Sequence, residues 1–364
     1  MWSCDDRLVY RHPAGRADVP LHPACRQPLV PQEKGGRGLK YRVLNIVRQL
    51  ALTLLVIWTV VSLVTLLIEV VPGDPATVIL GETATQEQIE NFRNKHGLDR
   101  PAFFASYSSE NGFIWNGVNN RYADYWIGIL HGDLGTSMRT DRPVLDMIFE
   151  RYPSTIKLAI AAMLVAIGIA LPLGVLAGSR KNSLVDNFAS FFALLGISLP
   201  TFVIGPFLVY IFAVKLGWFS PTGSLYPEDI ILPAVTLGAA LSAILTRMVR
   251  SSVIEELGED YVRTARAKGV SERVVLYKHV LKNGLIPVVT ILGLQLGVLL
   301  AGAIITEKIF SWQGLGLLLL EDGIGKRDYR LVQGCVLVIS VTFIIANSLT
   351  DLVYRRLDPR IRMG

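Results

Sequence analysis

The residues with the types and spacing for a specific interaction lie between 255 and 271, in the most basic loop of a largely apolar chain. Two residue pairs are spaced three or four apart, so in a helix each pair would share one face. These pairs are Arg263 with Arg266 and Thr264 with Lys268. Gly269 suits the left-handed residue that ends a helix. The pattern predicts a short charged helix that docks on a partner; the alternative is a solvated loop whose basic residues only orient the chain in a membrane.

Residues for catalysis or metal binding are not evident. The sequence holds no Gly-x4-Gly-Lys-Ser/Thr phosphate loop, no His-Glu-x-x-His and no Gly-x-Ser-x-Gly. Cys4, Cys25 and Cys335 are too few and too scattered for a disulfide framework. His12 and His22 do not give the first two cysteines the spacing of a zinc site. We therefore expect no catalytic residue, no metal site and no nucleotide bound by this chain.

The elements that must position the basic loop are membrane spans. Six segments lack Asp, Glu, Lys, Arg and His: 49–68, 158–179, 187–214, 230–246, 283–306 and 331–350. A helix needs roughly 20 apolar residues to cross a bilayer, so we expect six spans, the fourth extending through Arg247. A proton-driven carrier would be expected to keep a charged group inside a span. Its absence suggests that energy enters from outside the bilayer, through the basic loop.

The distribution of lysine and arginine predicts the orientation. Basic residues gather in alternate loops: Lys34, Arg37, Lys40, Arg42 and Arg48; Arg180 and Lys181; Arg247, Arg250, Arg263, Arg266, Lys268, Arg273, Lys278 and Lys282; and Arg355, Arg356, Arg360 and Arg362. We expect these loops and both termini to be cytoplasmic. The segment 76–153 has more acidic than basic residues and should lie outside. This topology accounts for the net charge of +6, so no nucleic-acid partner is expected.

The run from Asp260 to Gly269, followed by His279 and Asn283, resembles the coupling-helix signature of ABC importer permeases. The variant is that of the first, B-type subunit in the dipeptide/oligopeptide/nickel family. The broader motif begins with Glu-Ala-Ala, where this chain has Arg-Thr-Ala at 263–265, with the glycine in register. The resemblance implies that the coupling residues are Glu256, Asp260, Tyr261, Arg263, Thr264, Ala265, Arg266, Ala267, Lys268 and Gly269.

Further stretches resemble the same family between Tyr41 and Arg362. They include Val71-Pro72-Gly73-Asp74-Pro75, His96-Gly97-Leu98-Asp99-Arg100-Pro101, Gly132–Ser137, Leu232–Gly238, Leu300–Ala303 with Glu307, Phe310–Gly316, Arg327–Tyr329 and Leu357–Arg360. The candidates for an extracytoplasmic gate or turn are Pro72, Gly73, Asp74, Trp312, Gly314 and Gly316. An aromatic anchor at the membrane surface is an equal alternative for Trp312. A helix is expected over Thr85–His96, ended by Gly97, and a surface loop over Ser106–Tyr122.

The resemblance implies an all-α polytopic membrane protein of the ABC importer type I permease kind, with six transmembrane helices, a cytoplasmic coupling helix and a sizeable extracytoplasmic segment after the first span. The expected divisions are a disordered cytoplasmic extension (1–43), a first transmembrane helix (44–71), an extracytoplasmic segment (72–153), a five-helix core (154–356) with its coupling loop (251–282), and a cytoplasmic tail (357–364).

In such a system this subunit would lie in the cytoplasmic (inner) membrane, among its lipids. It would pair with a similar permease subunit, with two ATPase subunits that hold ATP and Mg, and with an extracytoplasmic solute-binding protein. The implied cargo is di- or oligopeptides; nickel chelates, glutathione and oligosaccharides are alternatives within the family. A secondary transporter or channel would be favoured by inverted repeats or an intramembrane carboxylate, and neither is evident. A membrane enzyme would need a catalytic cluster, for which His131 with Asp133 is too little.

Overall fold

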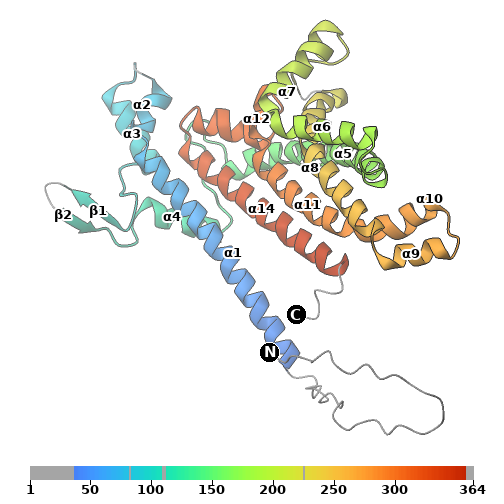
Figure 1. Ribbon diagram of the computed structural model, residues 1–364. Coiled ribbons are helices and arrows are strands. Elements are labelled where there is room, and N and C mark those ends of the chain that lie inside the picture. Colours follow the sequence, from blue (N-terminus) through green and yellow to red (C-terminus); the bar gives the residue numbers. More distant parts are fainter. Residues whose placement is uncertain (1–36, 82, 109–111, 224–225, 358–364) are drawn as a thin grey trace, which may run out of the picture. The chain divides into compact units, whose positions relative to one another are not determined.

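The computed structural model describes residues 37–357 except 82, 109–111 and 224–225 (Figure 1). Most of the expected N-terminal extension and of the C-terminal tail lies outside the described residues. The first helix, α1 (Arg37–Val70), begins before the expected start at residue 44. By internal contacts the chain divides into two compact units, 1–51 and 52–364. All packing described below lies within the second unit.

The described residues contain five helical stretches that are long and apolar enough to cross a membrane, or six if one bent pair counts as a span. The stretches are Val47–Val70 within α1, α5 (Val144–Ser179), the short turn η3 (Pro227–Ile230) with α8 (Ile231–Leu257), the run Glu272–Leu300, and Tyr329–Val353 within α14 (Tyr329–Leu357). The fourth stretch combines α10 (Glu272–Val274), the π-helical η4 (Val275–Val280) and α11 (Leu281–Gly302). This architecture agrees with the predicted polytopic helical fold.

The third expected span is not a single helix. Its residues form α6 (Leu184–Ser198) and α7 (Thr201–Leu208), the latter continued by the π-helical η2 (Val209–Lys215), and the two parts meet at 102°. The break lies at Pro200, which has no N–H to donate. A proline also disfavours helical geometry in the residue before it, and Leu199 is extended, with φ −90° and ψ 118°.

Small residues bring α5 and α8 close together. A Cβ added to Gly174 would lie 2.6 Å from Cβ of Val249, and one added to Gly178 would lie 2.8 Å from Cβ of Val253. Gly238 meets Val165 in the same way, at 2.7 Å. Close approach at small residues is how helices associate in lipid, where the hydrophobic effect does not drive them together. The end of α8 that leads into the basic loop is therefore held tightly against α5.

The segment after α1 carries its own small elements: α2 (Pro75–Leu80), α3 (Gln86–His96), β1 (Ala105–Ser108), β2 (Gly112–Trp115) and α4 (Arg121–Leu130). The predicted helix over 85–96 is confirmed: Thr85 and Gln88 form a reciprocal capping box, and Gly97 ends the helix at φ 64°. The expected surface segment is exposed, with Phe113 71% and Trp115 69% accessible, but it forms an antiparallel hairpin in place of an irregular loop, with Ala105 opposite Trp115, and α4 follows it. Apolar and polar residues alternate only weakly along this polar insert, so the sequence did not indicate its two strands.

Between α11 and α14 the chain forms α12 (Ile304–Ile309), α13 (Leu315–Leu317) and the π-helical η5 (Leu318–Ile324). A buried cluster joins this segment to α4, α5 and α14 through Tyr125, Ile148, Leu315 and Leu331.

Candidate functional site

The predicted docking helix is present as α9 (Asp260–Ala267), beyond the ends of α8 and α11 (Figure 1). Two backbone hydrogen bonds close its C-terminus: Val270 N–H donates to the Ala265 carbonyl at 3.3 Å, and Gly269 N–H to the Arg266 carbonyl at 2.9 Å. This is a Schellman motif, and it requires the left-handed conformation that Gly269 adopts at φ 76°. The helix therefore ends where the sequence predicted.

The inner face of α9 rests on an apolar cluster. Val262 is fully buried and belongs to one cluster with Val253 of α8 and with Val275 and Val280 of η4. Ala265 is half-buried against the same cluster. Apolar contacts fix the inner face of α9, and the Schellman motif fixes its C-terminus. Together they determine the direction of the helix.

Polar contacts join α9 to the rest of the sequence motif. The Tyr261 hydroxyl donates to the Glu256 carboxylate and lies 3.5 Å from the His279 carbonyl oxygen. Burial and the bond to Glu256 raise the pKa of Tyr261 to about 12, while a hydrogen bond with the Asn283 side chain acts in the opposite direction. The structure thus brings together residues that the sequence motif spreads over 28 positions, from Glu256 to Asn283.

The outer face of α9 is exposed and mainly basic. It carries Asp260, Arg263, Thr264, Arg266, Ala267 and Lys268. Arg266 forms a two-bond ion pair with Glu272 of α10, with Nε–Oε1 at 2.7 Å and Nη2–Oε2 at 3.2 Å, and this pair raises the pKa of Arg266. Arg263 lies 3.4 Å from Asp260. Such a surface offers no catalytic chemistry, but it is a preformed projection suited to contact with another protein.

A second candidate site is the Glu307 turn, residues 307–317. The Glu307 side chain is fully buried; its Oε1 accepts a hydrogen bond from Thr155 at 2.7 Å and its Oε2 accepts one from Leu317 N–H at 2.9 Å. The Thr155 hydroxyl oxygen in turn accepts from Leu315 N–H at 2.8 Å. Burial raises the pKa of the Glu307 carboxyl. One carboxylate and one hydroxyl therefore connect α5, α12 and α13.

Three predicted gate or turn residues belong to this site. A Cβ on Gly314 would overlap the Glu307 carboxylate, and one on Gly316 would lie 2.9 Å from Oε2, so the turn needs both glycines to close on the acid. Trp312 is 5% exposed, and its indole N–H donates to the Ser154 carbonyl at 3.0 Å. Its burial excludes an aromatic anchor facing lipid or water, which was the alternative prediction for this residue.

The other three gate or turn candidates form the turn after α1. Asp74 caps α2 by accepting from Ala76 N–H at 3.2 Å, and it pairs with Arg93 of α3 at 2.7 Å. This pair raises the pKa of Arg93. Gly73 has φ 110° and adjoins the Arg327 guanidinium, while Pro72 is exposed. The turn organises the start of the segment after α1; no described contact joins it to Glu307.

Sequence reasoning missed the long-range polar contacts. Asp186 of α6 is buried and binds Arg250 of α8 through two hydrogen bonds, of which Nη2–Oδ2 is 2.9 Å. Asp328 accepts a 2.5 Å bond from the Ser137 hydroxyl. Asp186 directly precedes an apolar run and Glu307 directly follows one. An acid at the end of a span was the signal available for these two residues.

The described helices are those of a polytopic membrane protein, and the comparisons with known proteins identify its class. The chain matches the family model "Binding-protein-dependent transport system inner membrane component" over residues 170–363. Its N-terminal companion model matches residues 43–159. The chain belongs to this family of ABC importer permeases, as the sequence resemblance predicted.

Relatives and solved structures agree with this assignment. The glutathione transport system permease protein GsiC of Escherichia coli (strain K12) is 41% identical over 300 residues, covering 82% of this chain and 92% of that protein. GsiC of Salmonella typhimurium (strain LT2) is 41% identical over 303 residues, covering 83% and 94%. The inward-facing MetNI methionine ABC transporter is similar in fold: TM-score 0.50, 18% identity, 59% of this chain and 97% of that one.

Family membership settles the general nature of the protein. It is a multi-pass inner-membrane permease of an ABC importer and not an enzyme. A permease of this kind implies ATPase subunits, a binding protein and a second permease as partners. The roles of the individual coupling and gate residues stay predictions.

Proposed function

We propose that this chain is the first, B-type permease subunit of a peptide-family importer and that α9 transmits ATP-driven motion from an ATPase subunit to the spans. One observation carries this proposal: α9 is seated on buried Val262, closed by Gly269, and presents its basic face outward. A projection that is rigid on its inner side can convert movement of a partner into movement of α8 and α11. A solvated loop would lack this buried apolar contact.

The proposed assembly contains a second, similar permease subunit, two ATPase subunits and an extracytoplasmic solute-binding protein. ATP and Mg would bind to the ATPase subunits, since this sequence lacks a phosphate loop. Both termini would be cytoplasmic. α9 would dock on one ATPase subunit, with its basic residues on the side facing that partner.

The proposed cargo is a small peptide. The relatives above are named for glutathione, which is itself a tripeptide with free carboxylates. Glutathione is therefore the first substrate to test, followed by di- and oligopeptides. Nickel chelates and oligosaccharides are the remaining alternatives within the family.

The experiment is uptake in a bacterial strain that lacks its own peptide and glutathione importers and expresses this chain together with a second permease subunit, ATPase subunits and a binding protein from the same source. We expect labelled glutathione or a labelled dipeptide to accumulate, and accumulation to stop when ATP hydrolysis by the partner is disabled. Accumulation that continues without hydrolysis would favour secondary transport and overturn the proposal. Uptake of a nickel chelate or an oligosaccharide, without peptide, would overturn only the cargo.

A further inference from the structure

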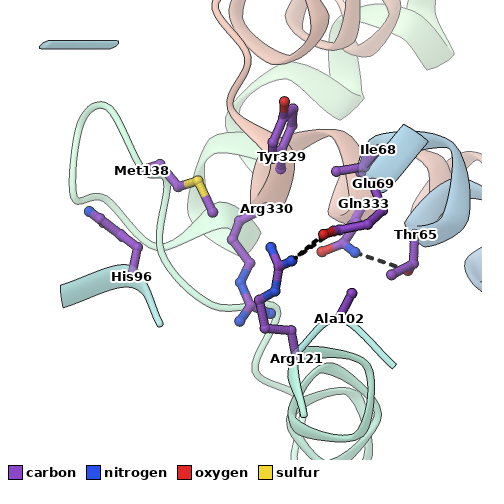
Figure 2. Close-up of a pocket in the computed structure, with 10 residues that line it drawn as sticks. All are labelled: Thr65, Ile68, Glu69, His96, Ala102, Arg121, Met138, Tyr329, Arg330 and Gln333. Carbon is purple, nitrogen blue, oxygen red and sulfur yellow. Dashed lines mark hydrogen bonds and ion pairs between the residues drawn. The ribbon is translucent and has the colours of Figure 1, made fainter. Parts of the chain in front are cut away.

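Arg330, in the first turn of α14, borders two hollows in the segment that we expect to be extracytoplasmic. The smaller is 30 Å³ and is shown in Figure 2, where the Arg330 side chain passes beside Arg121. The larger is 230 Å³ and is lined by Tyr125 and Gly135, among others. Arg330 is half-buried, and among the described residues no carboxylate pairs with its guanidinium. The guanidinium carbon lies 5.8 Å from the centre of the Tyr125 ring.

The acidic residues nearby are engaged elsewhere. Glu69 accepts two 2.7 Å hydrogen bonds from Arg121, as Figure 2 shows for this ion pair. Asp124 pairs with Arg100 at 2.7 Å, and Asp133 accepts from Gly135 N–H at 2.8 Å. Withdrawing a charge from water is costly unless a partner compensates it. The charges of Asp124 and Asp133 act on the Arg330 guanidinium from a distance, but among the described residues neither carboxylate forms a hydrogen bond with it, so the guanidinium is placed to receive an anion from the hollow.

Tyr125 supplies a second, independent observation. Its side chain is 2% exposed and lines the larger hollow, yet its buried hydroxyl has no hydrogen-bond partner in the described structure. A buried hydroxyl without a partner is unfavourable by an amount comparable to a lost hydrogen bond. His96 lines both hollows, and burial, followed by the charge of Lys95, lowers its pKa. The imidazole is then neutral at neutral pH and keeps one N–H to donate.

We propose that Arg330 and Tyr125 bind a small carboxylate in the 230 Å³ hollow, and that this carboxylate is the free C-terminus of an incoming peptide. A planar guanidinium matches the two oxygens of a carboxylate. The Tyr125 hydroxyl is buried, so it becomes a further donor only when the ring turns toward the hollow. Asp124 and Asp133 also line the hollow, so a ligand with surplus negative charge is disfavoured and a zwitterion is favoured. The choice of a peptide rests on the proposed function; the carboxylate site does not.

The test is a binding titration of the full chain, purified in lipid nanodiscs without its binding protein, using glycylglycine, glycylglycinamide and acetate. A charge-assisted bidentate contact corresponds to about 10- to 100-fold in affinity. We expect the wild-type chain to bind glycylglycine at least about 10-fold more tightly than the amide, which lacks the carboxylate. Arg330→Gln should abolish this preference, and Tyr125→Phe should reduce it. Arg139→Gln, at an exposed arginine that lines neither hollow, should leave it unchanged.

Equal binding of peptide and amide by the wild-type chain would overturn the proposal, as would a preference that survives Arg330→Gln. Acetate binding as tightly as glycylglycine would support the carboxylate site and overturn the peptide as its source. If Arg330→Gln does not fold, two measurements still test the proposal. They are the preference of the wild-type chain for the peptide over the amide and the reduction of this preference in Tyr125→Phe. Failure of the proposed function would show separately, as absence of peptide uptake, because binding is measured here without transport.

Discussion

At Gly269 the chain leaves α9 with φ 76°, and no heavy atom lies within 4 Å of the place where a Cβ would stand. A side chain there would meet no steric obstacle from neighbouring residues. Its cost would come from the backbone alone, because the left-handed region is unfavourable for residues with a Cβ and most of all for β-branched ones. A substitution at Gly269 should therefore change the direction of α9 without a steric clash with the residues around it.

We predict that Gly269→Val abolishes transport and stimulated ATP hydrolysis by the assembled importer while the chain still folds and inserts. A strained residue of this kind costs roughly 1–3 kcal/mol, which the variant would relieve by extending or tilting α9. The matched control is Gly97→Val, since Gly97 ends α3 at φ 64° with nothing within 4 Å. Uptake and ATPase activity are measured for both variants, and the loss is expected for Gly269→Val but not for the control. Normal transport by Gly269→Val would mean that the loop only orients the chain.

A second residue-scale prediction concerns Arg266, whose pair with Glu272 is exposed. The two side chains are 41% and 69% exposed, and exposed pairs contribute at most about 1 kcal/mol. We expect Arg266→Glu to abolish transport, because the charge reversal would repel the partner, and to leave thermal stability nearly unchanged.

The double variant Arg266→Glu with Glu272→Arg provides the control, since it restores the ion pair within the loop. We expect transport to remain lost in the double variant. Recovery of uptake would show that Arg266 acts through Glu272, and the direct contact with the ATPase would have to be abandoned.

At the scale of elements, the Glu307 turn depends on one buried carboxylate that links α5, α12 and α13. We predict that Glu307→Ala destabilises the protein by roughly 2–5 kcal/mol, since it leaves buried donors unsatisfied and opens a cavity. Glu321→Ala is the control, because Glu321 pairs with Lys308 at the exposed surface of the same segment. Thermal unfolding in detergent measures both. Equal losses in the two variants would contradict a special role for Glu307.

The pH dependence of the stability, compared between the wild-type chain and Glu307→Gln, gives a second measurement. Burial raises the pKa of Glu307, so the folded protein holds this proton more tightly than the unfolded chain. The resulting stability is full below the ordinary glutamate range and is lost as the pH rises through the folded-state value. Glu307→Gln cannot ionise and should lack this loss. A wild-type stability that does not fall over that range would contradict the shift.

Local signals in the sequence predicted the elements whose cause is local. Gly269 and Gly97 end helices through their own backbone freedom, and Thr85 caps the helix that follows it. The bend at Pro200 was missed, although the proline was visible, because an apolar run of span length outweighed it. The contact between Glu307 and Thr155 was not predictable, since the two residues lie 152 positions apart in the sequence.

At the scale of the whole molecule, the pairing of charged residues that lie far apart in the sequence was likewise not predictable. The segment 72–153 holds eleven acidic and seven basic residues, and the sequence does not show which of them meet. The structure pairs five of the basic ones with acids: Arg93 with Asp74, Lys95 with Asp141, Arg100 with Asp124, Arg121 with Glu69, and Arg142 with Glu150. Most basic residues of this segment are thus neutralised locally.

The last prediction is the topology: residues 251–282 face the cytoplasm and 72–153 face the opposite side. The rule that predicts it counts lysines and arginines in short loops, and long segments cross the membrane largely regardless of charge. Residues 251–282 form a short loop with six basic residues. Single cysteines at Arg266 and Trp115 test both sides, since the two side chains are exposed.

The chain for this test first needs its own cysteines replaced, Cys4 and Cys25 by serine and the buried Cys335 by alanine. In spheroplasts, a membrane-impermeant maleimide should label Trp115→Cys and not Arg266→Cys, and in inside-out vesicles the pattern should reverse. The two positions act as each other's control for expression and reactivity. Labelling of position 266 from the outer side would place α9 away from any cytoplasmic ATPase, and the coupling role proposed for it would fail with the topology.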